Sequence, residues 1–151
     1  MSHICLTYHI VWRTKYSHRT INEEHERDLF AYIFGFCKKK NCKLHRINSM
    51  PDHIHMCVEI HPTISLSEFM KVLKQESSRW LREHKELFPM FDSWSNGYAA
   101  FTYSVKDRIK VINYIKRQKE HHKTASFRNE YESLMKEFGL DSKSDKFLDD
   151  W

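Results

Sequence analysis

The chain has 151 residues, of which 40% are hydrophobic and 14% are aromatic. This length and apolar content predict one domain with one core and exclude a wholly disordered chain. No run of about 18 apolar residues is present, which argues against a membrane-spanning helix. The first 15 residues lack the uninterrupted apolar segment and small-residue cleavage site of a signal peptide, so we expect a cytoplasmic protein.

The charge of +5 is unevenly distributed along the chain. Residues 140–151 hold four Asp and two Lys, so the positive charge belongs to the rest of the sequence. A basic body with an acidic end is compatible with a polyanionic partner such as a nucleic acid, although many proteins without such a partner share it. We expect the acidic end to be a loose tail.

Four strands and four helices are predicted, in chain order. Runs of β-branched, aromatic or alternating residues predict strands at residues 5–12, 43–48, 53–60 and 98–105. Apolar residues at helical spacing predict helices at about residues 20–40, 65–88, 106–122 and 126–138. Capping boxes at Thr20–Glu23 and Ser65–Glu68 predict the start of the first two helices.

The element order is therefore β-α-β-β-α-β followed by two further helices. This order is typical of the ferredoxin-like α+β fold, an antiparallel four-stranded sheet with helices packed on one face. We expect a single domain with its core at about residues 5–122, a helical extension at 123–139 and the tail at 140–151.

The strand at residues 53–60 follows a Pro-Asp turn and alternates apolar with polar side chains. Its alternation predicts a half-buried strand, with His53 and His55 projecting from the same side. Two imidazoles so placed are able to share a metal ion. The alternatives are that both merely decorate a polar face, or that His61 or the pair His121–His122 provides the ligands.

The predicted cofactor is a divalent metal ion, Mn²⁺ or Mg²⁺. Imidazole ligands favour Mn²⁺ or another transition ion, because Mg²⁺ prefers oxygen. The three glycines are too scattered for a loop that cradles phosphates, so no nucleotide cofactor is expected.

Tyr114 and Gln118 lie four residues apart on the predicted helix at 106–122, which places them on one helix face. Tyr32 and Tyr131 also lie on predicted helices, but an apolar residue follows each of them at this spacing. A phenol beside an amide aimed at a metal ion would place a nucleophile next to a Lewis acid. A structural role for Tyr114 is the alternative.

Four blocks of the sequence together resemble the single-tyrosine transposases of the HUH type, which include small insertion-sequence transposases and their REP-associated relatives. Residues 50–55 (MPDHIH) resemble the histidine–hydrophobic–histidine motif of that family, and residues 114–118 (YIKRQ) resemble its Tyr-x-x-x-Gln helix motif. Residues 8–15 and 94–104 agree with the family in order and spacing. The likeness covers about residues 5–122, and the four blocks together are highly specific although each alone is not.

The resemblance implies a ferredoxin-like fold and a metal-dependent tyrosine transposase, a DNA endonuclease and strand-transferase acting at the nucleoid. His53, His55 and Gln118 would bind a divalent metal ion, and Tyr114 would attack a phosphodiester of single-stranded DNA that carries a hairpin. The products would be a 5′-phosphotyrosine linkage and a free 3′-OH, which later reverses the reaction at a new junction. Many such proteins are homodimers that exchange the tyrosine helix, so action in cis or in trans stays open.

Basic residues predict a surface for the DNA phosphates. Five lie on one side of the helix at 65–88 and three lie near the first strand. The predicted set is Lys71, Lys74, Arg79, Arg82, Lys85, Arg13, Lys15 and Arg19. A solvated helix face is the alternative for any one of them.

Two other classes of function fit parts of the sequence. A non-catalytic nucleic-acid-binding module is possible because this sheet architecture also serves RNA and DNA readers, but those expose aromatics where this strand has histidines. A metal-dependent hydrolase of small phosphoesters would use no covalent intermediate, which would leave Tyr114 without a role.

Overall fold

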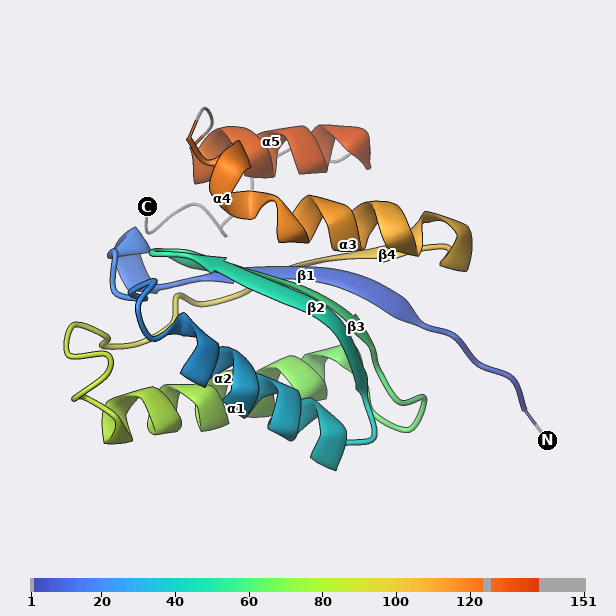
Figure 1. Cartoon of the computed structure of the whole chain (residues 1–151). Helices are drawn as coiled ribbons and strands as arrows, with labels where there is room; N and C mark the ends of the chain where they lie inside the picture. Colours follow the sequence, from blue (N-terminus) through green and yellow to red (C-terminus); the bar gives the residue numbers. More distant parts are fainter. Residues whose placement is uncertain (1, 124–125, 139–151) are drawn as a thin grey trace.

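The computed structural model describes residues 2–123 and 126–138. Its centre is a four-stranded antiparallel sheet in the order β2-β3-β1-β4 (Figure 1). The strands are β1 (Thr7–Arg13), β2 (Lys43–Met50), β3 (His53–Glu59) and β4 (Ala99–Tyr103). With α1 (Glu26–Lys39) after β1 and α2 (Leu66–Glu83) after β3, the β-α-β-β-α-β order of the predicted ferredoxin-like fold is confirmed.

Helices cover both faces of this sheet (Figure 1). α1 and α2 lie on one face, and α3 (Arg108–Lys116), α4 (Gln118–His121) and α5 (Phe127–Glu137) lie on the other. The main hydrophobic core lies between the sheet and the first pair of helices. Because the second group covers the opposite face, β3 is buried on both sides, and the prediction of a half-buried strand is wrong.

Serine side chains cap two of the helices. Ser65 accepts a hydrogen bond from the backbone N–H of Glu68 at 3.1 Å, as the second capping box predicts. Ser126 accepts one from the N–H of Asn129 at 3.2 Å and so opens α5.

The first capping box does not start a helix. Residues 23–25 form a turn, and α1 begins at Glu26. The Asn22 side chain accepts a hydrogen bond from the His25 N–H at 2.9 Å. A bond from an asparagine side chain to the N–H three residues on has the pattern of an N-cap, so Asn22 caps the turn that precedes α1.

The predicted helix at 106–122 is divided into a short 3-10 turn (Val105–Asp107), α3 and α4. The break lies at Arg117, whose backbone leaves the helical region at φ −95° and ψ 13°. The side chain of Asn48 on β2 donates to the carbonyl of Ile115 at 2.9 Å. This bond satisfies one of the carbonyls that the helix end leaves without a partner.

The helical extension predicted at 123–139 is represented by α5, while Gly139 and the predicted tail at 140–151 lie outside the described residues. None of the helices in the described ranges combines the length and the apolar character that crossing a membrane requires.

Candidate active site

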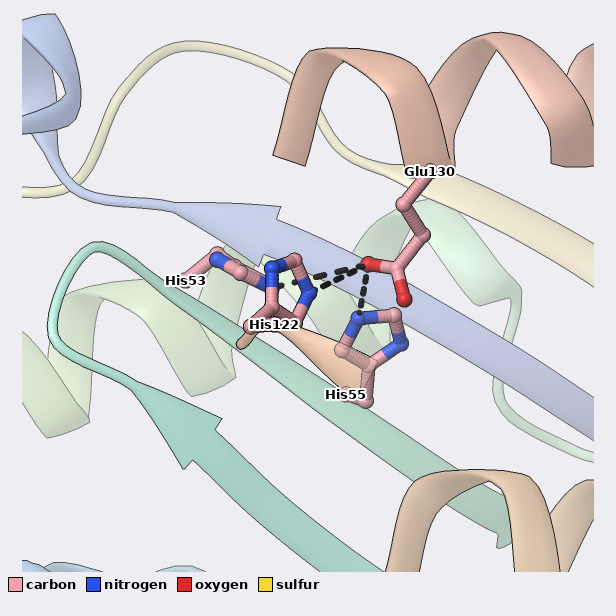
Figure 2. Close-up of side chains that lie close together, drawn as sticks. All are labelled: His53, His55, His122 and Glu130. Atoms are coloured by element: carbon pink, nitrogen blue, oxygen red, sulfur yellow. Dashed lines mark hydrogen bonds and ion pairs between the residues drawn. The ribbon is translucent and has the colours of Figure 1, made fainter. Parts of the chain in front are cut away.

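Two histidines of β3, His53 and His55, lie against Glu130 of α5, and both are fully buried. The Nε2 atom of His55 lies 2.8 Å from Oε1 of Glu130, a residue of α5 (Figure 2). The Nε2 atom of His53 lies 3.6 Å from the same oxygen. The alternation of β3 therefore places both imidazoles on one side, with Nε2 of each directed at the same point.

The second nitrogen of each ring is held by a neighbour. Nδ1 of His53 lies 2.7 Å from a carboxylate oxygen of Asp52, so this nitrogen carries the proton and donates it. Nδ1 of His55 lies 2.8 Å from Nε2 of His9, a buried residue of β1. Such partners orient a metal-binding histidine and leave its Nε2 lone pair free for an ion.

Tyr114, near the end of α3, and Gln118, at the start of α4, reach the same carboxylate from the other side. The Tyr114 hydroxyl donates a hydrogen bond to Oε2 of Glu130. The Gln118 side-chain amide donates to that oxygen at 3.0 Å. The structure thus brings together all four residues that the sequence motifs single out, and it does so within one chain.

A polar network fixes the break between α3 and α4. Lys119 Nζ donates to Oδ1 of Asn48 at 3.0 Å and lies 2.8 Å from a carboxylate oxygen of Glu26 on α1. Glu26 also accepts a hydrogen bond from the Ser49 hydroxyl at 3.0 Å. Because Asn48 also bonds to the end of α3, this network sets how Tyr114 and Gln118 face the histidines.

Glu130 was missed by sequence reasoning, although a signal was present. It lies three residues after Phe127 and four before Leu134, within the apolar stripe of α5. Phe127 and Leu134 pack with Tyr131 against strands β1 and β4, and this packing carries the carboxylate under the helix to the histidines. An acid inside an apolar helix face indicates a buried partner.

Of the alternative histidines, His122 belongs to the cluster and His61 does not. The Nε2 atom of His122 lies 3.1 Å from Oε1 of Glu130 (Figure 2). The ring of His61 instead lies 2.7 Å from the Thr63 hydroxyl in an exposed turn. His122 follows α4 directly, so the break at Arg117 also determines where this imidazole lies.

The electrostatics of the cluster favour a charged carboxylate and a neutral phenol. Burial raises the pKa of Glu130, but the charge of His55, the hydrogen bond to His122 and the nearby ring of His53 outweigh it and lower the pKa well below its usual range. Burial raises the pKa of Tyr114 strongly, and the neighbouring charge of Glu130 raises it further. The Tyr114 hydroxyl is therefore held protonated against Glu130.

The histidines differ from one another in their protonation. Burial lowers the pKa of His9 to about 3, and the nearby His55 lowers it too. Burial also lowers the pKa of His55. Burial opposes a proton on His53 as well, but the hydrogen bond to Asp52 and the negative charges of Asp52 and Glu130 raise its pKa overall.

The donor set fits a divalent metal ion. One ligand atom from each of His53, His55, His122 and Glu130 lies within 4.8 Å of the others. Two buried atoms of the site, Nε2 of His53 and Oε1 of Gln118, have no hydrogen-bond partner among the described residues. Buried polar atoms almost always have partners, and imidazole nitrogen and amide oxygen are atom types that a transition ion accepts as ligands.

The basic residues predicted for DNA do not surround this site. Four of them lie on α2, on the face of the sheet opposite α3–α5 (Figure 1), and Lys85 follows that helix. Arg13 is fully buried and donates to the Ser17 hydroxyl at 2.7 Å. Lys74 donates to the carbonyls of Ser95 and Gly97. The contact of these residues with DNA stays a prediction.

A pocket of about 600 Å³ opens beside the tyrosine. Tyr114 and His121 form part of its wall, and Lys110 and Arg117 bring positive charge to it. These two basic residues were not singled out from the sequence, although Lys110 lies four residues before Tyr114 and Arg117 three residues after it, a spacing that places both beside the tyrosine on a helix.

A protein-family model described as "Transposase IS200 like" matches residues 2–118 of this chain. The transposase of insertion sequence element IS200 from Salmonella typhimurium strain LT2 is 35% identical over 120 residues, covering 77% of this chain and 78% of that protein. The ISDra2 transposase TnpA of Deinococcus radiodurans is 26% identical over 117 residues, covering 75% of this chain and 84% of its own length.

Two solved structures share the fold. One is a candidate transposase from Deinococcus radiodurans R1, with a TM-score of 0.61 and 26% identity, covering 78% of this chain and 93% of the other. The second is a REP-associated tyrosine transposase bound to a REP hairpin, with a TM-score of 0.61 and 12% identity, covering 81% of this chain and 72% of the other.

Proposed function

The chain belongs to the IS200-like transposase family, and from this we propose that it is a metal-dependent endonuclease and strand-transferase for single-stranded DNA. The nucleophile is Tyr114, and the metal ligands are His53, His55 and Gln118. The substrate is a single strand with a hairpin, and the working form is a homodimer. The hairpin-bound relative supports this class of substrate.

The atoms proposed as metal ligands either have no hydrogen-bond partner in the described residues or belong to rings whose other nitrogen is held by a neighbour. Nε2 of His53 and Oε1 of Gln118 are buried without hydrogen-bond partners in the described part of the chain. Asp52 and His9 hold the opposite nitrogens of His53 and His55. A divalent ion held there supplies positive charge that polarises a phosphodiester.

The covalent step is a transesterification. The Tyr114 oxygen forms a bond to phosphorus while the bond from phosphorus to the 3′ oxygen breaks. The phenol loses its proton to solvent and the leaving 3′ oxygen gains one, giving a 5′-phosphotyrosine linkage and a free 3′-OH. The linkage preserves the energy of the phosphodiester, so the 3′-OH of another strand can reverse the step and rejoin the DNA.

Positive charge at the pocket beside Tyr114 suits the incoming strand. Lys110 and Arg117 line this pocket, and single-stranded DNA is held by basic grooves that follow its backbone. Tyr114 lies with the histidines of its own chain, which supports catalysis in cis.

One observation carries the proposal. The Tyr114 hydroxyl and Nε2 of His55 contact the two oxygens of a single carboxylate, Glu130. A carboxylate and the non-bridging oxygens of a phosphodiester are similar in charge and spacing, so nucleophile and ligands converge on a volume that suits a scissile phosphate.

The test is a covalent-adduct assay. Wild-type protein, Mn²⁺ and a hairpin-bearing single strand from the flanking genomic DNA are expected to give a shifted protein–DNA band on a denaturing gel. Tyr114→Phe is expected to abolish the band and retain binding, while Tyr16→Phe, at an exposed tyrosine, keeps it. An adduct with Tyr114→Phe would refute the nucleophile. Salt-sensitive binding by wild-type protein without any cleavage would favour a non-catalytic binding module.

A further inference from the structure

Glu130 is the point at which all parts of the candidate site meet, yet it belongs to none of the motifs that identify the family. The family match covers residues 2–118, so His122 and Glu130 both lie beyond it. The Glu130 side chain is only 1% exposed. A carboxylate buried this deeply needs compensating partners, and here every one of its partners is a residue of the candidate site.

The two oxygens of Glu130 contact two different sets of groups. Oε1 lies 2.8, 3.1 and 3.6 Å from the Nε2 atoms of His55, His122 and His53, respectively (Figure 2). Oε2 accepts hydrogen bonds from the Tyr114 hydroxyl and the Gln118 amide, and it lies 3.3 Å from Nε2 of His121. One oxygen therefore faces the metal-ligating nitrogens, and the other faces the nucleophile.

The spacing on the histidine side suits a closed coordination shell. A tetrahedral ion with bonds of about 2.0 Å needs ligand atoms about 3.3 Å apart. The distances from Oε1 to the three nitrogens lie close to this value, and all four ligand atoms lie within 4.8 Å of one another. Three imidazoles with one carboxylate are a ligand set that transition ions accept.

We propose that, in the absence of DNA, His122 and Glu130 complete a four-coordinate site with His53 and His55, in which Gln118 bonds to Glu130 instead of to the ion, and that the scissile phosphate replaces Glu130. This inference rests on the proposed function, because it assigns two further ligands to the same ion. Glu130 is the ligand to be exchanged because it occupies the place next to Tyr114 where the phosphorus must lie. Its charge would also repel the phosphate.

The position of α5 makes such an exchange feasible. Glu130 reaches the site from a helix that packs through Phe127, Tyr131 and Leu134 on β1 and β4. The histidines of β3 belong to a strand that pairs on both edges. Withdrawal of one glutamate side chain leaves the sheet intact, whereas withdrawal of His53 or His55 would disrupt it.

The experiment measures metal binding directly, without cleavage. Full-length protein is titrated with Co²⁺, whose visible absorption is strong in a four-coordinate site and weak in a site of higher coordination. Glu130→Gln and His122→Gln are each expected to weaken Co²⁺ binding at least about tenfold and to reduce the band. Glu132→Gln is the matched control, because Glu132 lies on the same helix and is exposed.

The second arm measures DNA binding in a Tyr114→Phe background, so that the strand stays uncut. Addition of a hairpin-bearing single strand is expected to change the Co²⁺ spectrum of this protein toward that of Glu130→Gln. Glu130→Gln and Glu130→Ala are expected to bind the strand more tightly while binding Co²⁺ more weakly. These opposite changes cannot come from partial unfolding, which would weaken both.

Three results would overturn the inference. Unchanged Co²⁺ affinity in Glu130→Gln and Glu130→Ala would remove Glu130 from the ligand set, even if His53→Ala abolishes binding and so supports the proposed function. A Co²⁺ spectrum that DNA does not alter would rule out the exchange. A loss of both Co²⁺ and DNA binding in the Glu130 variants would give this residue a structural role. If the proposed function itself is wrong, the result is a different one: His53→Ala would bind Co²⁺ as tightly as wild type does.

Discussion

The two faces of strand β3 use the same stretch of chain for different purposes. On one face, Ile54, Met56 and Val58 are completely buried in the main hydrophobic core with α1 and α2. On the other, His53 and His55 are equally buried, but their neighbours are a carboxylate, an amide and a phenol. The side chains on the two faces are therefore equally buried, but those on one face are apolar and these two on the other are polar.

This difference shows how the fold separates stability from chemistry. The apolar face stabilises the sheet through removal of hydrocarbon from water. The polar face depends on partners for its buried groups, and Glu130 bonds to His55, His122, Tyr114 and the Gln118 amide while Nε2 of His53 and Oε1 of Gln118 stay without one in the described part of the chain. The comparison predicts that substitutions on one face change stability, and that substitutions on the other change metal binding and cleavage.

Removal of an imidazole from the polar face is the strongest test of this division. His53→Ala is expected to lower Mn²⁺-dependent cleavage about 10³-fold, because the ion loses a ligand and the phosphate loses its polarising charge. Single-turnover cleavage of a labelled hairpin strand measures the change. His61→Ala serves as the control, since this ring contacts only an exposed threonine. Unchanged cleavage by His53→Ala at saturating Mn²⁺ would remove this histidine from the site.

The pH dependence of stability gives a second test, centred on His9. Because its folded-state pKa is about 3 and its ordinary value is 6.5, the unfolded chain binds the proton more readily between these values. The contribution of His9 to stability is therefore lost as pH falls from 6.5 toward 3, by up to about 1.4 kcal/mol per pH unit. Urea unfolding of metal-free protein between pH 4 and 7 measures the free energy of unfolding at each pH. This free energy is expected to change less steeply with pH in His9→Gln than in wild type.

Other groups of the cluster also change the stability over this pH range. The test is therefore the difference between wild type and His9→Gln in how steeply the free energy of unfolding changes with pH. The lowered pKa of Glu130 also removes stability in acid, and the raised pKa of His53 acts in the opposite direction. Both are present in wild type and in His9→Gln. Equal slopes for the two proteins would show that His9 is not the buried neutral ring described here.

The smallest expected effect belongs to the apolar face. Ile54→Val removes one buried methylene from the main core and is expected to lower the free energy of unfolding by about 1 kcal/mol. Its affinity for Co²⁺ and its rate of cleavage are expected to match wild type, although His53 and His55 are its sequence neighbours. A metal affinity that fell with stability would show that the two faces of β3 are coupled.

The alternation of β3 and the apolar spacing of the helices were sufficient to predict the fold. They could not predict that β3 is covered on both sides, because a polar strand face looks the same whether it meets water or a polar cluster. The break at Arg117 was also missed, since it depends on Asn48, a residue that bonds the end of α3 from another strand.

The residues of the candidate site also differ in whether local sequence patterns predict them. His53 and His55 were found by a period of two, and Tyr114 and Gln118 by a spacing of four, because those signals are local. Glu130 joins the site through the packing of α5 on the sheet; its place in the apolar stripe of α5 indicates a buried partner, but no local pattern specifies which one.

The central claim is that Tyr114 forms the covalent bond to DNA, and peptide mapping of the adduct tests it most directly. Protein is incubated with Mn²⁺ and the hairpin strand, digested with nuclease and protease, and analysed by mass spectrometry. The account predicts that the peptide containing Tyr114 carries a nucleotide attached through its 5′ phosphate. A nucleotide on any other residue, or cleaved DNA with no modified peptide, would contradict it.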